Sequence, residues 1–415
     1  MTNQPALAEG PAPGETPPEK RRIPLIAKVY GVVCILSSVA VLLLAALIVV
    51  GFTLSFIRGE IDLSIDTSAA NVIIFAMELA LFVALFVLLL VLGINLLRNR
   101  RRGAAQTAEA AAFVTTGVIA CEIMLNGVGG INIPILVLLG ISIALASWLD
   151  PSLAQERELQ RKLRDMETRE AAEEGTLGLD ETGKGYITLN FFNLFWIFVV
   201  ASVIGLVLET IYHFAVVDPG HYQDRAGLVF GPFSPIYGVG AVLMTMALNR
   251  FHKAHIVVIF LVSAVIGGVF EYLAGWFFQF AFGIVAWDYT GSTLFGLCPD
   301  PIAILFQGRT SALFMCMWGV LGVAWMKLLL PWMLHLVNKI PWNWRYTLTT
   351  ICATLMVAEC LFTLLSFDCW YERMAGNAPT SAIEHFMADH FDNSYMEDRF
   401  QSMTLNPDNA TRNAR

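Results

Sequence analysis

Residues 191–217 read FFNLFWIFVVASVIGLVLETIYHFAVV, and this stretch decides the fold. It contains neither lysine nor arginine, and Glu209 is its one acidic residue. A helix needs about 20 apolar residues to cross the hydrocarbon core of a bilayer, and this run is longer. A surface helix of a water-soluble protein would carry a polar face, which is missing here. The stretch therefore predicts a transmembrane helix.

The composition of the whole chain agrees with this interpretation. Of 415 residues, 56% are hydrophobic and 14% are charged, and the mean hydropathy is +0.63. A soluble globular chain carries about 25% charged residues, so this chain cannot cover a water-facing surface of its size. A soluble enzyme, a nucleic-acid-binding protein and a disordered scaffold are therefore disfavoured. We expect a multi-pass protein of the cell membrane, in contact with the lipid bilayer and not with nucleic acid.

Similar apolar runs on both sides of residues 191–217 predict an all-α polytopic membrane helix bundle of about nine spans. The third run is the least apolar, because it contains Glu109, Glu122 and two threonines. The predicted spans are Val29–Phe56, Asn71–Leu97, Glu109–Leu125, Ile131–Leu149, Phe191–Val217, Phe233–Leu248, Ile256–Phe282, Ser311–Leu334 and Tyr346–Phe367.

The basic residues of the short loops orient these spans. Loops on the cytoplasmic side carry an excess of lysine and arginine, and a cytoplasmic N-terminus gives that excess. An odd number of spans then leaves the acidic C-terminal tail outside. The inner residues are Arg98, Arg100, Arg101, Arg102, Arg250, Lys253, Lys339 and Arg345, and the outer ones are Arg58, Arg225 and Arg309.

The polar stretches divide the chain into six predicted parts. The helix within the charged stretch is interpreted as a cytoplasmic connection, with a docking surface for a partner as the alternative. In the C-terminal tail, Ser381 and Glu384 have capping-box spacing, and the helix that follows would lie on the membrane or pack on the outer loops. The parts are a disordered cytoplasmic tail (1–25), a four-helix membrane region (26–150), a charged connecting helix (151–188), a permease-like membrane domain of two repeats (189–345), a last transmembrane helix (346–367) and an acidic tail with an amphipathic helix (368–415).

An internal repeat is visible in the C-terminal half. Residues 203–209 read VIGLVLE and residues 265–271 read VIGGVFE. A Phe-Gly pair and then a Pro-Ile pair follow each copy, which predicts two parallel repeats of a rising helix, an outer loop and a returning helix. Small residues let helix backbones approach closely in lipid. We therefore expect the two helices to face each other and to bring their glutamates into the bundle interior.

The predicted spans hold five glutamates and almost no cations. A charged residue at the centre of a bilayer costs about 2.5–3.5 kcal/mol on an insertion scale, so we expect some of these carboxyl groups to be neutral and hydrogen-bonded between helices. The repeat favours a functional role for Glu209 and Glu271, with His213 and Arg309 as candidate partners. The five are Glu78, Glu122, Glu209, Glu271 and Glu359.

Four motifs carry a resemblance to a known family. They are GPFSPIYGVG at 231–240, FEYLAGW at 270–276, WDY at 287–289 and GR at 308–309. Together they resemble the bacterial family called putative ABC-transporter type IV, or putative ABC transporter permease, over about residues 190–335. This sequence departs from the family by an enlarged stretch between the last two motifs.

The resemblance implies a permease subunit. The pattern GxxxxGK[ST], which cradles nucleotide phosphates, is missing from the sequence. An ATPase that drives this protein would therefore be a separate chain, docked on residues 151–175 or on the loops at Arg250 and Arg345. We expect no cofactor, no metal and no catalytic residue. The candidate substrate-binding residues are Glu209, His213, Tyr237, Glu271, Trp287, Asp288 and Arg309.

Two other functions fit the sequence. The first alternative is a membrane scaffold or sensor that does not transport and that organises partner proteins. The charged helix and the two polar tails favour this alternative. The second is an intramembrane hydrolase with a metal bound by Glu209 and His213. A single E-x-x-x-H pattern lacks a full ligand set for zinc, so permease and scaffold stay as the leading hypotheses.

Overall fold

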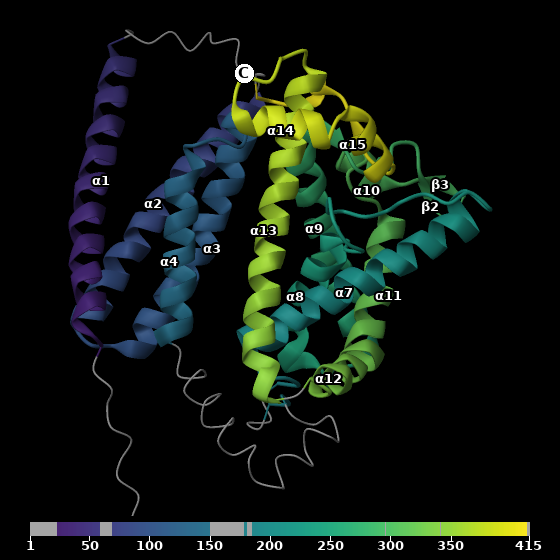
Figure 1. Ribbon diagram of the computed structural model, residues 1–415, viewed down its shortest axis with the longest axis horizontal. Coiled ribbons are helices and arrows are strands. Elements are labelled where there is room, and N and C mark those ends of the chain that lie inside the picture. The colour runs from purple at the N-terminus through teal and green to yellow at the C-terminus, as the bar shows by residue number, and fades with distance from the viewer. Residues whose placement is uncertain are drawn as a thin grey trace, which may run out of the picture.

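A computed structural model of the chain describes residues 23–58, 69–149, 178–180, 185–294, 296–340 and 342–412. Within these ranges nearly all regular structure is helical, and the strands have two residues each. The predicted all-α membrane bundle is confirmed (Figure 1). The predicted N-terminal tail up to residue 22 and the charged helix of residues 151–175 lie outside the described residues.

The first four long helices form one group. Each packs on the next along the chain, and alanines such as Ala104, Ala108 and Ala111 let the third helix lie close to its neighbours. Glu122, which made this span the least apolar, is buried inside the group and accepts a hydrogen bond from Asn126 at 2.8 Å. The helices are α1 (Leu25–Ile57), α2 (Ala69–Leu97), α3 (Arg101–Asn126) and α4 (Asn132–Leu149).

The second group contains the motifs. Here α7 packs on α8 and α9 packs on α11, and α9 also contacts α3 of the first group. Turns of π-helix continue α7 and join α11 to α12. The elements are α7 (Phe191–Tyr212), η1 (His213–Val217), α8 (Pro235–Leu248), η2 (Asn249–Phe251), α9 (Ile256–Phe282), α11 (Ala312–Ala324), η3 (Trp325–Leu329), α12 (Leu330–Asn338) and α13 (Trp342–Met374).

The predicted span Phe233–Leu248 is wrong as a full crossing. Its helix, α8, has 14 residues, or about 21 Å, against the about 30 Å of a hydrocarbon core. The backbone N–H of Ser234 donates to the carbonyl of Ser202, halfway along α7. Residues 218–234, which we name the first outer segment after the predicted orientation, therefore run back along α7 before Pro235 starts α8. Eight helices in the described part of the chain are long and apolar enough to span.

The chain nevertheless returns to its starting side through α8. The N–H of Tyr186, before α7, donates to Asn249 at the end of α8, so these two ends are adjacent.

The second outer segment, residues 283–311, joins α9 to α11. It contains β1 (Ile284–Val285), β2 (Thr293–Leu294), β3 (Cys298–Pro299) and α10 (Pro301–Leu305). Pro301, which the repeat placed at the returning helix, instead starts α10, and α11 begins later.

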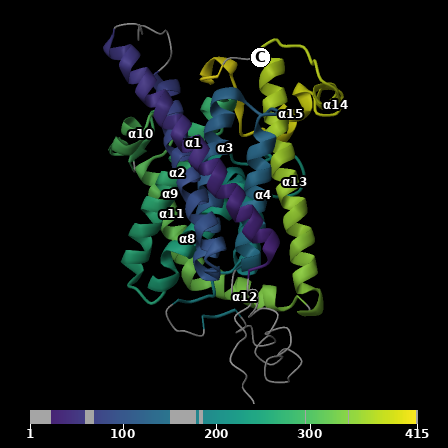
Figure 2. The ribbon, with the colours of Figure 1, turned by 90° about the vertical axis from the view of Figure 1, so that its left-hand side faces the viewer.

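The C-terminal segment, residues 375–412, packs over one end of the bundle, opposite α12 (Figures 1 and 2). The predicted capping box of Ser381 and Glu384 is confirmed. Met387, Phe391 and Phe400 are buried in a cluster with the end of α13, so this segment packs on protein. Its elements are α14 (Ala382–His390), α15 (Asn393–Arg399), β4 (Thr404–Leu405), which pairs antiparallel with β1, and η4 (Pro407–Asn409).

Candidate functional site

Glu209 lies near the C-terminal end of α7 and forms an ion pair with Arg225 of the first outer segment. The Arg225 Nη2 is 2.8 Å from Glu209 Oε1, and Nε donates to the same oxygen at 3.0 Å. Both side chains are about one-fifth exposed, at 23% and 21%. The carboxylate therefore has a cationic partner, but this partner is neither His213 nor Arg309, the two candidates from the sequence.

Glu271 of α9 is buried more deeply, at 4% exposure, and is held by two hydroxyl groups. Tyr289 donates to Oε1 at 2.7 Å, and Thr310 donates to Oε2 at 2.9 Å. Both donors come from the second outer segment, and the Tyr289 ring stacks on Phe314 with 4.3 Å between ring centroids. The two glutamates thus have different partners, one a guanidinium and the other a pair of hydroxyls.

Two aromatic rings stand between the glutamate-bearing helices. A side chain added at Gly205 would collide with Tyr237, and one added at Gly267 would collide with Trp318. The two rings contact each other, with centroids 5.8 Å apart. The small residues were predicted to let α7 and α9 face each other directly. They instead make room for rings from α8 and α11.

Two tyrosines lie close to both glutamates. The Tyr237 hydroxyl lies beside Glu209 and also interacts with Glu271. Burial raises the pKa of the Tyr289 hydroxyl, and the charges of Glu271 and Glu209 raise it further. One buried polar group therefore extends from α7 to α9. We call it the glutamate cluster, and it consists of Glu209, Arg225, Tyr237, Glu271, Tyr289 and Thr310.

Asp300 fixes the second outer segment where it turns back into the bundle. Its buried carboxylate accepts hydrogen bonds from N–H groups at the starts of both α10 and α11, including Ile302 at 2.9 Å and Ala312 at 2.9 Å. Burial alone would raise the pKa of Asp300, but these backbone donors outweigh it and lower the pKa. The carboxylate thus caps two helices and sets the position of Thr310.

Of the other predicted site residues, Trp287 and Arg309 hold the second outer segment in place. The Trp287 indole N–H donates to the carbonyl of Arg309 at 2.9 Å, and the Arg309 guanidinium bonds Gln279 and lies over the Phe280 ring. Asp288 is exposed and accepts from a backbone N–H two residues later. His213 lies in the π-helical turn one turn beyond Glu209. The structure brings none of these four side chains onto a glutamate carboxylate.

Sequence reasoning missed Arg225, Tyr289 and Thr310 as partners of the glutamates. Tyr289 ends the WDY motif and Thr310 follows the GR motif, so the motif positions were a usable signal for both. Arg225 appeared only as a basic residue of an outer loop. Its role depends on a loop that folds back along α7, and no local pattern encodes that path.

The remaining membrane glutamates have structural partners. Glu78 lies against Glu122 in the first helix group. Glu359 of α13 accepts from the backbone N–H of Phe230 at 2.7 Å, which ties α13 to the first outer segment. These contacts fit the predicted role of carboxyl groups that join helices. Among the described residues, no three His, Cys, Asp or Glu side chains are placed to hold a metal ion.

The long membrane helices and the buried carboxyl groups define a polytopic α-helical membrane protein. Residues 196–364 match the model of the family described as putative ABC-transporter type IV, which confirms the resemblance predicted from the motifs. The match extends from the motifs into α13 and includes every residue of the glutamate cluster, whereas α1–α4 precede it. Comparison with curated proteins and with solved structures found no match.

Proposed function

We propose that the chain is a permease-like subunit that moves a small solute or ion through the glutamate cluster. One observation supports this proposal best. Each of two glutamates in membrane helices is bonded to side chains that come from an outer segment, and the two sets of side chains form one cluster. Ionisable residues within membrane helices mark substrate and ion pathways. Irregular backbone at membrane depth is tolerated only where it is buried in protein or lines a wet cavity.

The two glutamates suit different steps of such a function. Glu209 and Arg225 form an ion pair that a cationic solute would compete for, since a cation near Glu209 replaces the guanidinium. Glu271 accepts hydroxyl hydrogen bonds, which leaves its charge to be balanced by a bound proton or by the solute. Tyr237 and Tyr289 lie between the two carboxyl groups, so a change of charge at one affects the other. A proton shared in this way couples to solute movement.

We further propose a cytoplasmic N-terminus, a location in the bacterial cell membrane and a separate ATPase subunit. The family description supports the ATPase. The excess of basic residues in the predicted inner loops supports the orientation. Arg250 is exposed and available for docking at that side, and the other predicted docking helix, residues 151–175, lies outside the described residues.

Flux through purified protein in proteoliposomes tests the transport proposal. Proton flux is read with an internal pH dye, and uptake of radiolabelled rubidium and choline is read by filtration. We expect Glu209→Gln and Glu271→Gln each to lower the flux at least about tenfold, because each removes a charge that the site uses. Glu78→Gln is the matched control, since it removes a membrane carboxylate of the first helix group, away from the cluster and from both outer segments. Unchanged flux in both cluster variants would sink the assignment.

The scaffold hypothesis predicts a different result. Affinity purification of the full chain from its native membrane, followed by mass spectrometry, identifies the stable partners. A recurring ATPase supports the permease subunit, which acts as a channel for solute and not as an enzyme. Recovery of envelope or signalling proteins alone, with no flux in proteoliposomes, supports the scaffold.

A further inference from the structure

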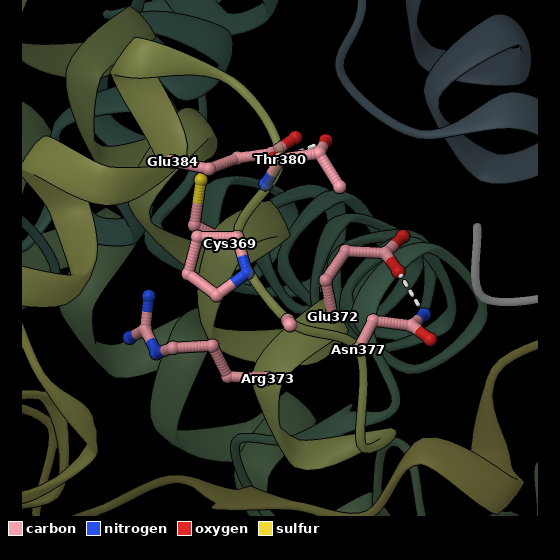
Figure 3. Close-up of a pocket in the computed structure, with 8 residues that line it drawn as sticks. Cys369, Glu372, Arg373, Asn377, Thr380 and Glu384 are labelled. Atoms are coloured by element: carbon pink, nitrogen blue, oxygen red, sulfur yellow. Dashed lines mark hydrogen bonds between the residues drawn. The ribbon is translucent and has the colours of Figure 1, made fainter.

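A cavity of about 320 Å³ lies where α13 ends and the chain turns into α14 (Figure 3). Its walls come from the last turns of α13, from residues 377–380 and from Glu384 at the start of α14. Small-molecule sites in proteins measure about 300–1,000 Å³, so a compact organic molecule fits. The lining is distinct from the glutamate cluster, and the cavity is therefore a separate candidate site.

This end of α13 projects beyond the hydrocarbon core of the membrane. The helix has 33 residues, or about 50 Å, against the about 30 Å of the core. Its last two turns carry the charged residues Asp368, Glu372 and Arg373, which are costly inside lipid. Ala378 and Thr380, which line the cavity, are exposed. A water-borne solute therefore reaches the cavity without crossing lipid.

Two carboxylates form the negative part of the wall. Glu372 Oε2 accepts from the Asn377 side chain at 2.8 Å, and Oε1 is 3.5 Å from Arg412 Nη1. Arg412 lies closer to Asp368, at 2.6 Å, so two carboxylates share this guanidinium. Glu384 accepts hydrogen bonds from uncharged groups at the start of α14. This part of the wall favours a cationic group of a ligand.

Arg373 forms the positive part of the wall. Its Nε donates to Asn393 Oδ1 at 2.8 Å and its Nη2 donates to the carbonyl of Phe391 at 2.8 Å, so both acceptors are uncharged. Asp392 acts on the guanidinium electrostatically, and its side chain caps α15. Within the described residues, Nη1 forms no hydrogen bond. A ligand anion can therefore accept one from it.

The two signs of charge lie on different sides of the cavity. Glu372 and Arg373 are neighbours on one helix, and side chains at such spacing do not face each other. Glu372 is bonded towards Asn377, whereas Arg373 is bonded towards the start of α15. Figure 3 shows Arg373 pointing away from Glu372 and Asn377. Opposite charges held apart in this way are complementary to a ligand that carries both signs.

We propose that this cavity binds a small zwitterion of the α-amino acid type. The carboxylate of the ligand accepts from Arg373, and its ammonium group donates to Glu372 and Glu384. The side chain of the ligand lies against the less polar part of the wall, at Cys369 and Pro379. The inference does not rest on the proposed function, because the cavity is separate from the glutamate cluster and its test measures binding.

Binding to the full chain in nanodiscs tests the proposal. The standard L-amino acids are first screened by thermal unfolding, because a ligand that binds only the folded state raises the unfolding temperature. The most stabilising one is then measured by titration calorimetry beside two analogues with the same side chain, the amine that lacks the carboxylate and the acid that lacks the amino group. We expect the amino acid to bind at least about tenfold more tightly than either, because each analogue loses a charge-assisted contact.

Variants assign each contact. Arg373→Gln should weaken binding of the amino acid at least about tenfold and leave the amine unaffected. Glu384→Gln keeps an acceptor for the capping box and should weaken the amino acid and the amine but not the acid. Ala378→Leu narrows the cavity without a change of charge and should weaken all three. Asp389→Asn removes an exposed carboxylate of α14 outside the cavity and is the control, with wild-type binding.

Three results would overturn the inference. The first is the lack of stabilisation by every standard amino acid. The second is an amine or an acid that binds as tightly as the amino acid, which indicates a site for a simple ion. The third is unchanged affinity in Ala378→Leu, which places the bound amino acid elsewhere. The last two need no change at Arg373, so they decide the matter even if Arg373→Gln does not fold.

Discussion

At the scale of single residues, the ion pair between Glu209 and Arg225 is a contact that the sequence pattern does not predict. The predicted spans alone left Glu209 without a cation. The first outer segment supplies one by returning to the depth of the carboxylate. A buried ion pair is costly to break on one side only, because the remaining charge stays in a poor solvent for ions.

Removal of either partner should therefore destabilise the protein more than removal of both. We expect Arg225→Gln to lower the free energy of unfolding by about 1–3 kcal/mol, less than for a fully buried pair because both side chains are partly exposed. The double variant Glu209→Gln/Arg225→Gln should recover part of that loss. Thermal unfolding of the four proteins in one detergent measures the coupling. Additive effects of the two single changes would contradict the ion pair.

The glycines of the repeat motif give a second prediction. An alanine at Gly205 would collide with Tyr237 and one at Gly267 with Trp318, so each change should cost about 1–3 kcal/mol of stability through overpacking. Gly140→Ala is the control, since an added Cβ there meets nothing within 4 Å. A helix gains about 0.5–1 kcal/mol when glycine becomes alanine, so this variant should unfold at the same or a higher temperature. Equal behaviour of all three variants would argue against the aromatic contacts.

At the scale of elements, α10 and α11 depend on one carboxylate. Asp300→Ala should cost about 1–3 kcal/mol, because two helix starts lose their acceptor, whereas Asp300→Asn retains an acceptor and should cost less.

The folded-state pKa of Asp300 is lowered below the ordinary value of 3.8. The carboxylate therefore stabilises the fold above about pH 4, and this stabilisation is lost as the pH falls through the folded-state pKa. Thermal unfolding between neutral pH and pH 3 should show a component that Asp300→Asn lacks. The same pH dependence in both proteins would exclude this role.

Hydropathy predicted the eight long apolar helices of the described residues and overestimated α8 as a full crossing. The mean hydropathy of a window does not distinguish a helix from an extended stretch of chain. Phe233 therefore raises the hydropathy of the predicted span although it precedes the helix. Pro235 was the better signal, because proline favours the first turn of a helix and removes a donor further along. The glycine and proline at 231 and 232 place the break before it. The GPFSPIYGVG motif therefore marks where a segment inside the bundle changes from irregular chain to helix.

At the scale of the whole molecule, composition was sufficient to predict the bundle, and the repeat singled out Glu209 and Glu271 as candidates. Their proximity was predicted from the repeat, but not the reason for it. The two helices were expected to face each other through their small residues, and aromatic rings from α8 and α11 fill that place. Arg225 could not be assigned, since it acts through a loop whose path is set by tertiary contacts. The cavity at the end of α13 depends on tertiary contacts in the same way.

The central claim is that Glu209 and Glu271 form one site, and flux through the double variant tests it most directly. The proteins are Glu209→Gln, Glu271→Gln, the combination of both, and Glu78→Gln as the control, each in proteoliposomes with the pH dye and labelled rubidium. Residues that act as a unit are non-additive, so the double variant should lose no more flux than either single one. Losses that multiply in the double variant would indicate two independent sites, and full flux in it would contradict the account.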